Sequence, residues 1–76
     1  MFTEDYPNLA WWITSHGWIE LGEDEHSHSW VRILDIGGTC YEDEDSDSLE
    51  EAMEVADRWT SREIADRFGE DPPSAV

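Results

Sequence analysis

The chain has 76 residues, of which 20 are Asp or Glu and only 4 are Lys or Arg, so its formal net charge is −16 with histidine neutral. A surface of this sign repels nucleic-acid phosphates and anionic lipid headgroups, which excludes direct binding to nucleic acid or to a membrane surface. The length fits one small domain, the single cysteine cannot form an internal disulfide, and neither a signal peptide nor a membrane span is visible, so we expect a cytoplasmic protein.

The first predicted element is a short helix within the segment 7–17. Apolar positions at i, i+3, i+4 and i+7 are occupied by Leu9, Trp12, Ile13 and His16. Pro7 suits the first turn of a helix, and Gly17 suits the position just after its end. A strand over residues 9–13 is the alternative, because apolar residues also alternate there and Trp and Ile favour sheets.

Three strands are predicted next. Residues 18–22 alternate, residues 30–36 form the strongest strand pattern, and residues 39–43 pair back as the third strand. The pair Gly37–Gly38 predicts a two-residue hairpin turn, because both glycines can adopt positive φ. Residues 23–29 have no apolar side chain and are expected to form a loop. The pattern therefore predicts an antiparallel meander.

From Ser48 onward the apolar period changes to that of a helix. The stripe consists of Leu49, Ala52, Met53, Ala56 and Trp59, followed by Ile64, Ala65 and Phe68. Ser48 and Glu51 have the spacing of a capping box, which places the start of the helix. Thr60 and Glu63 repeat this spacing, so the helix either continues or restarts there, and Gly69 ends it.

The order of these elements predicts an α+β fold. We expect a small two-layer domain with a short N-terminal helix, a three-stranded antiparallel sheet, and a C-terminal helix packed on the sheet. Residues 1–70 would form this single domain, and residues 71–76, which include two prolines, would form a flexible tail. Five Trp residues are large enough to supply much of the core.

Negative charge is concentrated in the middle of the sequence. Residues 20–54 carry thirteen acids and one base, Arg32, whereas the segments on either side each have a net charge of −2. Two like charges about 10 Å apart in water cost roughly 0.4 kcal/mol before screening, so this density destabilises a compact chain. Salt would relieve the repulsion in general, and a cationic partner would relieve it specifically.

Rows of such carboxylates approximate the charges of a nucleic-acid backbone, since alternate residues of a strand are about 6.6 Å apart. We therefore expect a small acidic non-enzymatic binding protein, a nucleic-acid mimic that blocks the basic cleft of a DNA- or RNA-binding protein. A phage or mobile-element inhibitor of a host nuclease or defence complex would be an example. The predicted partner-binding residues are Glu42, Asp43, Glu44, Asp45 and Asp47, followed by Glu23, Asp24, Glu25, Glu50, Glu51 and Glu54. Trp18 or Tyr41 would anchor the edge of the contact.

Two other interpretations stay open. An accessory α+β domain, able to form a homodimer, would owe its acidity to solubility or to adaptation to high salt, which the absence of lysine favours. The other interpretation is a weak divalent-metal-binding module, because residues 43–54 supply oxygen ligands at several positions of a calcium loop. Ser48, however, stands where this loop needs a glycine. His26 and His28 form an incomplete zinc set without further ligands. We expect no dedicated metal site and no cofactor.

No catalytic site is predicted. Cys40 is followed by acids, which oppose thiolate formation, and we interpret it as a buried thiol. His16 lies on the apolar stripe of the first helix and is expected to be a partly buried structural residue. Close carboxylate pairs arise by chance among so many acids, so the sequence selects no general acid or base.

Overall fold

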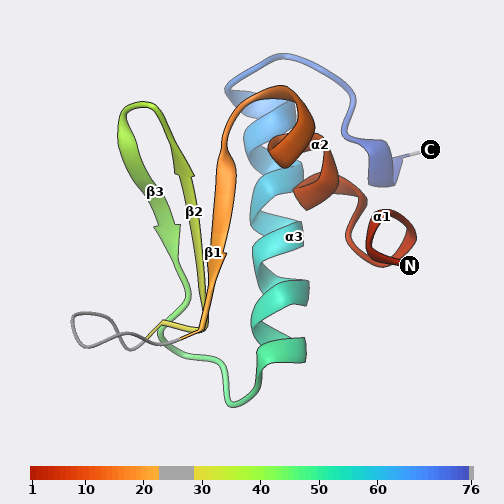
Figure 1. The fold of residues 1–76 in the computed structure, drawn as a ribbon. Helices are drawn as coiled ribbons and strands as arrows, with labels where there is room; N and C mark the ends of the chain where they lie inside the picture. The colour runs from red at the N-terminus through yellow and green to blue at the C-terminus, as the bar shows by residue number, and fades with distance from the viewer. Residues whose placement is uncertain (23–28, 76) are drawn as a thin grey trace.

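The structure is a computed structural model, and it describes residues 1–22 and 29–75. Its elements are α1 (Phe2–Asp5), α2 (Pro7–Ser15), β1 (Trp18–Leu21), β2 (Val31–Asp35), β3 (Gly38–Glu42), α3 (Leu49–Asp66) and the 3-10 helix η1 (Pro73–Ala75). Figure 1 shows the helices on one side of the three-stranded sheet. The predicted α+β architecture is confirmed, and residues 7–15 form a helix rather than a strand. Most of the predicted loop over residues 23–29 lies outside the described residues.

β2 is the central strand, and β1 and β3 pair with it in antiparallel orientation. Ile33 of β2 lies opposite Ile19 on one side and Tyr41 on the other, so these three side chains share the face that the helices cover. Trp18 and Leu34, which are also opposite each other, therefore belong to the other face of the sheet. None of the described elements packs against that second face (Figure 1).

The turn between β2 and β3 differs from the prediction. Asp35 pairs with Gly38, so the turn residues are Ile36 and Gly37 instead of the two glycines. The Asp35 Oδ1 atom accepts a hydrogen bond from the Gly37 N–H at 2.8 Å, and this local side-chain bond starts the bend one residue earlier. Only Gly38 of the glycine pair has positive φ, at 114°. Ile36, which was expected within a strand, is therefore fully exposed at the hairpin tip.

The core lies between the sheet and the helices. Its fully or almost fully buried hydrophobic residues are Leu9, Trp12, Val31, Ile33, Ala52, Met53 and Ala56. The indole N–H of Trp12 donates to the Leu34 carbonyl at 2.8 Å, so the one polar atom of this large side chain is satisfied. Gly17 passes so close that a Cβ atom there would overlap both the Leu34 oxygen and the Trp12 indole nitrogen. Only glycine fits at this crossing.

α3 begins where the capping box predicted. The Ser48 hydroxyl accepts a hydrogen bond from the Glu51 N–H at 3.1 Å, as expected. The Glu51 carboxylate accepts from the N–H of Asp47 at 3.1 Å rather than from that of Ser48, so the return bond is displaced by one residue. The helix does not restart at Thr60, whose hydroxyl donates at 2.8 Å to the carbonyl four residues earlier. Gly69, with φ of 66°, follows its end.

The N-terminus of α2 is capped by a residue of α3. The side chain of Tyr6, at the cap position, makes no capping hydrogen bond. The Asp57 carboxylate instead accepts from the N–H groups of Asn8 and Leu9, both at 3.0 Å, and from the Asn8 side-chain amide at 2.9 Å. The Asn8 amide also donates to the Ser74 hydroxyl at 3.0 Å. This contact holds η1, which is part of the predicted tail, against α2.

Candidate functional site

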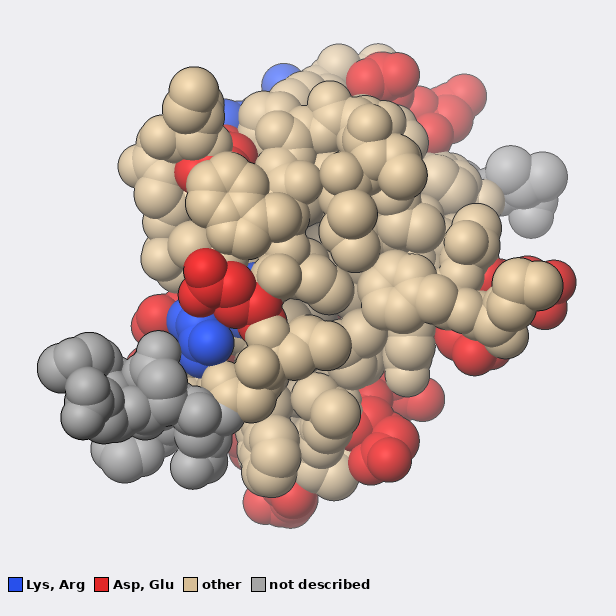
Figure 2. All heavy atoms as spheres, in the orientation of Figure 1, with Lys and Arg blue, Asp and Glu red and all other residues tan. Residues whose placement is uncertain are grey.

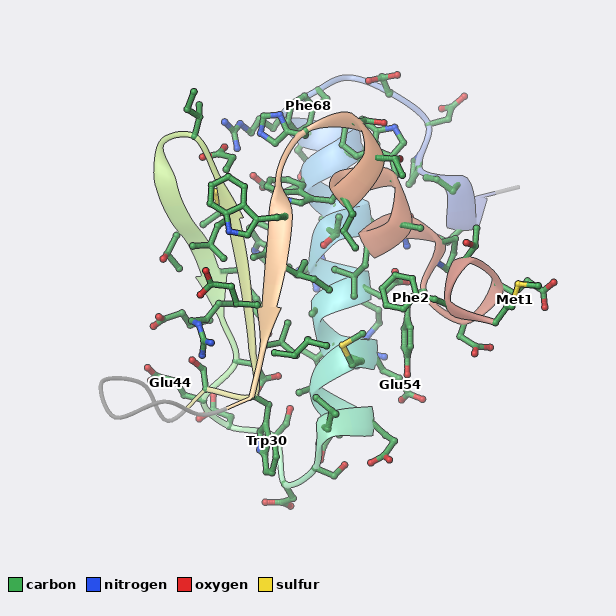
Figure 3. The ribbon with its side chains drawn as sticks, in the orientation of Figure 1. Met1, Phe2, Trp30, Glu44, Glu54 and Phe68 are labelled. Carbon is green, nitrogen blue, oxygen red and sulfur yellow. The ribbon has the colours of Figure 1, made fainter. Side chains whose placement is uncertain are left out.

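A hollow of about 240 Å³ lies between the end of β3 and the start of α3. It is lined by Tyr41, Glu42, Asp43, Glu44, Asp45, Ser46, Glu51 and Val55. Five of these residues are acids of the predicted partner-binding set, which the fold thus brings together. Asp47 and Glu50 adjoin the hollow in sequence without lining it, and Figure 3 shows Glu54 on the other side of α3 from Glu44. We call this hollow and the acids that line it the acidic hollow.

Asp43 has a structural role in the acidic hollow. Its side chain is only 3% exposed, and its carboxylate accepts hydrogen bonds from the N–H of Ser46 at 3.0 Å and from the Ser46 hydroxyl at 2.7 Å. These bonds close a turn directly after β3. We predicted Asp43 as part of the charge array, but it is buried, and the exposed acids on this loop are Glu44, Asp45 and Asp47. The Asp43 charge contributes to the field of the hollow from beneath its surface.

The loop that carries these acids is tied to the body of the protein. The Trp30 indole N–H donates to the Ser46 carbonyl at 3.2 Å, from the strand side of the loop. On the helix side, the Glu51 carboxylate receives the N–H of Asp47, as described above. Both of these bonds hold the Ser46–Asp47 peptide, and the start of the loop is held by the Asp43 N–H, which donates to the Val31 carbonyl at 3.0 Å. Glu44 and Asp45 therefore lie between two points at which the backbone is hydrogen-bonded to the body of the protein.

Tyr41 links the acidic hollow to the core. Its ring stacks on that of Trp59 from α3, with the ring centroids 5.1 Å apart. Burial, and then the neighbouring carboxylates of Asp43 and Asp45, raise the pKa of the Tyr41 hydroxyl. Of the two aromatic anchors that we predicted, Tyr41 therefore lines the hollow, whereas Trp18 is 45% exposed on β1, at the opposite edge of the sheet.

Charge compensation is uneven among the acids at this end of the molecule. In the sheet register, Arg32 of β2 lies between Glu20 of β1 and Glu42 of β3, and its Nε atom donates to Glu20 at 3.2 Å. The Arg32 guanidinium, on the strand next to β3, therefore offsets part of the Glu42 charge. Within the part of the chain that the structure describes, Glu44 and Asp45 form no ion pair. These two carboxylates are therefore available to an external cation.

Acidic side chains are not evenly distributed over the surface. Figure 2 shows the face along β1, where uncharged residues form a continuous area and Asp and Glu side chains lie around its margin. Acids also occur on α1 and near the C-terminus, so the acidic hollow is one of several acidic places on the described surface. Glu23, Asp24 and Glu25 lie outside the described residues, and their predicted role stays a prediction.

A second polar cluster, which the sequence did not indicate, lies where β2 meets the ends of α2 and α3. The Asp35 carboxylate is hydrogen-bonded to His16 Nε2 at 2.9 Å, to the Gly37 N–H at 2.8 Å and to Arg67 Nη2 at 3.2 Å. These bonds, that of His16 foremost, lower the pKa of Asp35 to about 2. The Phe68 ring covers the cluster, with its centroid 4.7 Å from that of the His16 ring (Figure 3). His16 is thus a partly buried structural residue, as predicted.

Cys40 lies beside this cluster and is not the buried thiol that we expected. It is half-buried, and it has no cross-strand partner because a bulge shifts the register between Ile33 and Leu34. Burial, and then the nearby Asp35 carboxylate, raise the pKa of the thiol. Cysteine, histidine and aspartate therefore meet here, but the carboxylate opposes formation of the thiolate. The cluster does not activate a nucleophile.

The structure gives no support to a calcium loop at residues 43–54. Glu54 belongs to α3 instead of closing a loop, and the Asp43 carboxylate is occupied by Ser46. Over residues 1–22 and 29–75, no three His, Cys, Asp or Glu side chains gather in a geometry that could hold a metal ion. His26 and His28 lie outside this part of the chain.

Comparisons with known proteins identify no relative of this chain. No family model matches the chain, and no curated protein or solved structure is significantly similar to it. Among the described helices, none is both long enough and apolar enough to cross a membrane. The functional argument therefore depends on the geometry and charge of the acidic hollow.

Proposed function

We propose that this protein is a non-enzymatic binding protein whose acidic hollow receives cationic side chains of a nucleic-acid-binding protein and so blocks access of nucleic acid to that partner. The observation that carries the proposal is the convergence of Glu42, Glu44, Asp45 and Glu51 on one hollow, whose loop is hydrogen-bonded to the body of the protein at Asp43 and at the Ser46–Asp47 peptide. A fixed array of like charges offers a basic cleft a ligand that needs little reordering on binding.

The size of the hollow favours a side chain over a free metabolite. Ligand pockets for small molecules usually enclose about 300–1,000 Å³, whereas this hollow has about 240 Å³ and is open to one side. Arg and Lys side chains of a partner would enter it end-on. A guanidinium can donate paired hydrogen bonds to a carboxylate, which gives such contacts both strength and orientation.

Mimicry requires charge at more than one point. Asp47 and Glu50 continue the row of acids beyond the hollow, and neither forms an ion pair with another described residue. A partner that normally follows a phosphate backbone would meet successive carboxylates along this row. An array of this kind predicts binding that weakens as salt concentration rises, because the contacts are between exposed charges.

The test is charge reversal with a matched control. The double variant Glu44→Lys, Asp45→Lys changes two adjacent exposed acids of the hollow and leaves the structural Asp43 intact. The control Glu70→Lys, Asp71→Lys changes two adjacent exposed acids beyond the far end of α3, with the same change in net charge. Both proteins and the unchanged chain would be used to capture partners from the source cell, with identification by mass spectrometry.

We expect the hollow variant to lose capture of a nucleic-acid-binding protein by about tenfold or more, and the control to retain it. An oligonucleotide should displace the captured protein. Equal loss in both variants would mean that net charge alone controls capture, and equal retention would mean that the hollow is not the binding surface. A chain that captures nothing and is only stabilised by salt would support adaptation to high salt instead.

A further inference from the structure

The outer edge of β1 has backbone hydrogen-bonding groups that no other described strand uses. β1 is an edge strand, and no described residue pairs with its outer side. The Gly22 N–H donates to the Trp30 carbonyl at 2.7 Å, and antiparallel partners alternate between bonded and non-bonded pairs. Glu20 therefore bonds to β2, whereas Ile19 and Leu21 direct their N–H and carbonyl groups outward. These groups match the needs of one further strand.

Apolar side chains flank this edge on both faces of the sheet. Trp18 is 45% exposed and Leu21 is 51% exposed, and because they are three residues apart in a strand, they point to opposite faces. Figure 2 shows that the uncharged area continues from β1 over the N-terminal helices, where Phe2 is also exposed. A strand added at β1 would cover Trp18 with one set of its side chains and Leu21 with the other.

Charge decides which occupant fits. Asp and Glu side chains surround the uncharged area (Figure 2), and the chain as a whole carries a net charge of −16. A second copy would bring an equal negative charge to the same place. In an antiparallel dimer, the outward groups of Ile19 in one copy would bond to those of Leu21 in the other. Glu20 of one copy would then lie directly opposite Glu20 of the other, and like charges opposite each other destabilise a strand pair.

We propose that the β1 edge is a docking site for an extended segment of another protein in which basic residues alternate with apolar ones. The segment adds as a fourth strand, and its backbone bonds to Ile19 and Leu21. Its apolar side chains all lie on one face, where they cover Leu21, and its basic side chains lie over Trp18 on the other face. Its basic side chains reach the carboxylates at the margin. This site is separate from the acidic hollow, which adjoins β3 at the other edge of the sheet.

The probe is a synthetic peptide in which Arg and Val alternate, titrated into the isotope-labelled full chain and followed by NMR. One control peptide has the same charge with central prolines, which cannot form a strand, and another has Glu in place of Arg. We expect the Arg–Val peptide to shift the amide signals of Ile19 and Leu21 and to slow their hydrogen exchange. The proline and Glu peptides should do neither.

Two variant pairs locate the contact. Leu21→Pro removes an outward N–H without removing a bond to β2, and Ile36→Pro makes the same change at the exposed hairpin tip, where proline suits a turn. Leu21→Lys and Ile36→Lys form a second pair that keeps every backbone donor, in case proline prevents folding. Each Leu21 variant should weaken peptide binding by about tenfold, and each Ile36 variant should leave it unchanged.

Several results would overturn the proposal. Equal binding of the proline peptide would show that charge, and not strand pairing, holds the segment. Shifts confined to residues 42–51 would assign the peptide to the acidic hollow, and an absence of shifts at Ile19 and Leu21 up to millimolar peptide would leave the edge without its ligand. Sedimentation that shows dimers of this chain, lost in Leu21→Pro, would assign the edge to a second copy. Charge reversal at Glu44 and Asp45 tests the proposed function independently of all these outcomes.

Discussion

Replacement of Asp57 by alanine tests how the two helices are joined. The Asp57 carboxylate lies on α3, yet it provides the N-terminal cap of α2 and accepts three hydrogen bonds from Asn8 and Leu9. On a chain with a net charge of −16, removal of an ordinary surface carboxylate should stabilise the fold slightly or leave it unchanged, because it reduces repulsion. Asp57→Ala should do the opposite.

The size of the effect follows from the groups that lose a partner. Loss of an N-cap acceptor costs about 1 kcal/mol. The Asn8 side chain is almost fully buried, and loss of one partner of a buried amide costs about 1–3 kcal/mol, moderated here by its remaining bond to Ser74. Together these losses predict a decrease of about 2–4 kcal/mol in the free energy of unfolding. That is a large share of the stability of a small domain.

Urea unfolding followed by tryptophan fluorescence would measure this change. The control is Asp66→Ala, which removes an exposed carboxylate from the same helix and should change stability by less than about 0.5 kcal/mol. For a domain of this size, each kcal/mol lowers the melting temperature by about 4–8 °C, so thermal unfolding gives a second readout. If the two variants were equally stable, the cap from α3 would not stabilise α2, and the account of how the helices are joined would be wrong.

Three further predictions concern stability. Asp35 has a pKa of about 2, below its ordinary value of 3.8, so its contribution to the free energy of unfolding is complete above pH 3.8 and is lost as the pH falls toward 2. Asp35→Asn should therefore reduce the loss of stability at low pH, as measured by urea unfolding at a series of pH values. Trp12→Phe removes the donor to the partly buried Leu34 carbonyl and should cost about 1–3 kcal/mol by the same method, whereas Trp18→Phe, at a half-exposed position, should cost less. The urea midpoint of the unchanged protein should rise with added NaCl, because screening weakens the repulsion among its acids; a midpoint that stays constant would show that this repulsion does not limit stability.

Local patterns predicted the elements well, because the residues that define them are close in sequence. Ser48 and Glu51 placed the start of α3 through a bond that spans three residues. The turn after β2 was displaced by one residue for an equally local reason, since the Asp35 side chain captures the Gly37 N–H. Aspartate before a glycine pair was a visible signal for this bend, but the glycines alone determined the prediction.

Contacts between distant segments were not predictable in the same way. The bond from Asn8 to Asp57 joins residues 49 positions apart, and the cluster of His16, Asp35 and Arg67 joins three separate elements. For the acidic hollow, the sequence indicated a dense group of acids but not which of them would be exposed. Asp43 is buried because the chain turns immediately after β3, and no composition or periodicity signals that turn.

The central claim is that this protein and nucleic acid compete for one cationic cleft. The most direct measurement is a calorimetric titration of the purified partner with this protein, in the absence and in the presence of saturating oligonucleotide. Competition predicts that the binding heat disappears when the oligonucleotide is bound. An unchanged affinity, with a ternary complex of protein, partner and oligonucleotide, would contradict it.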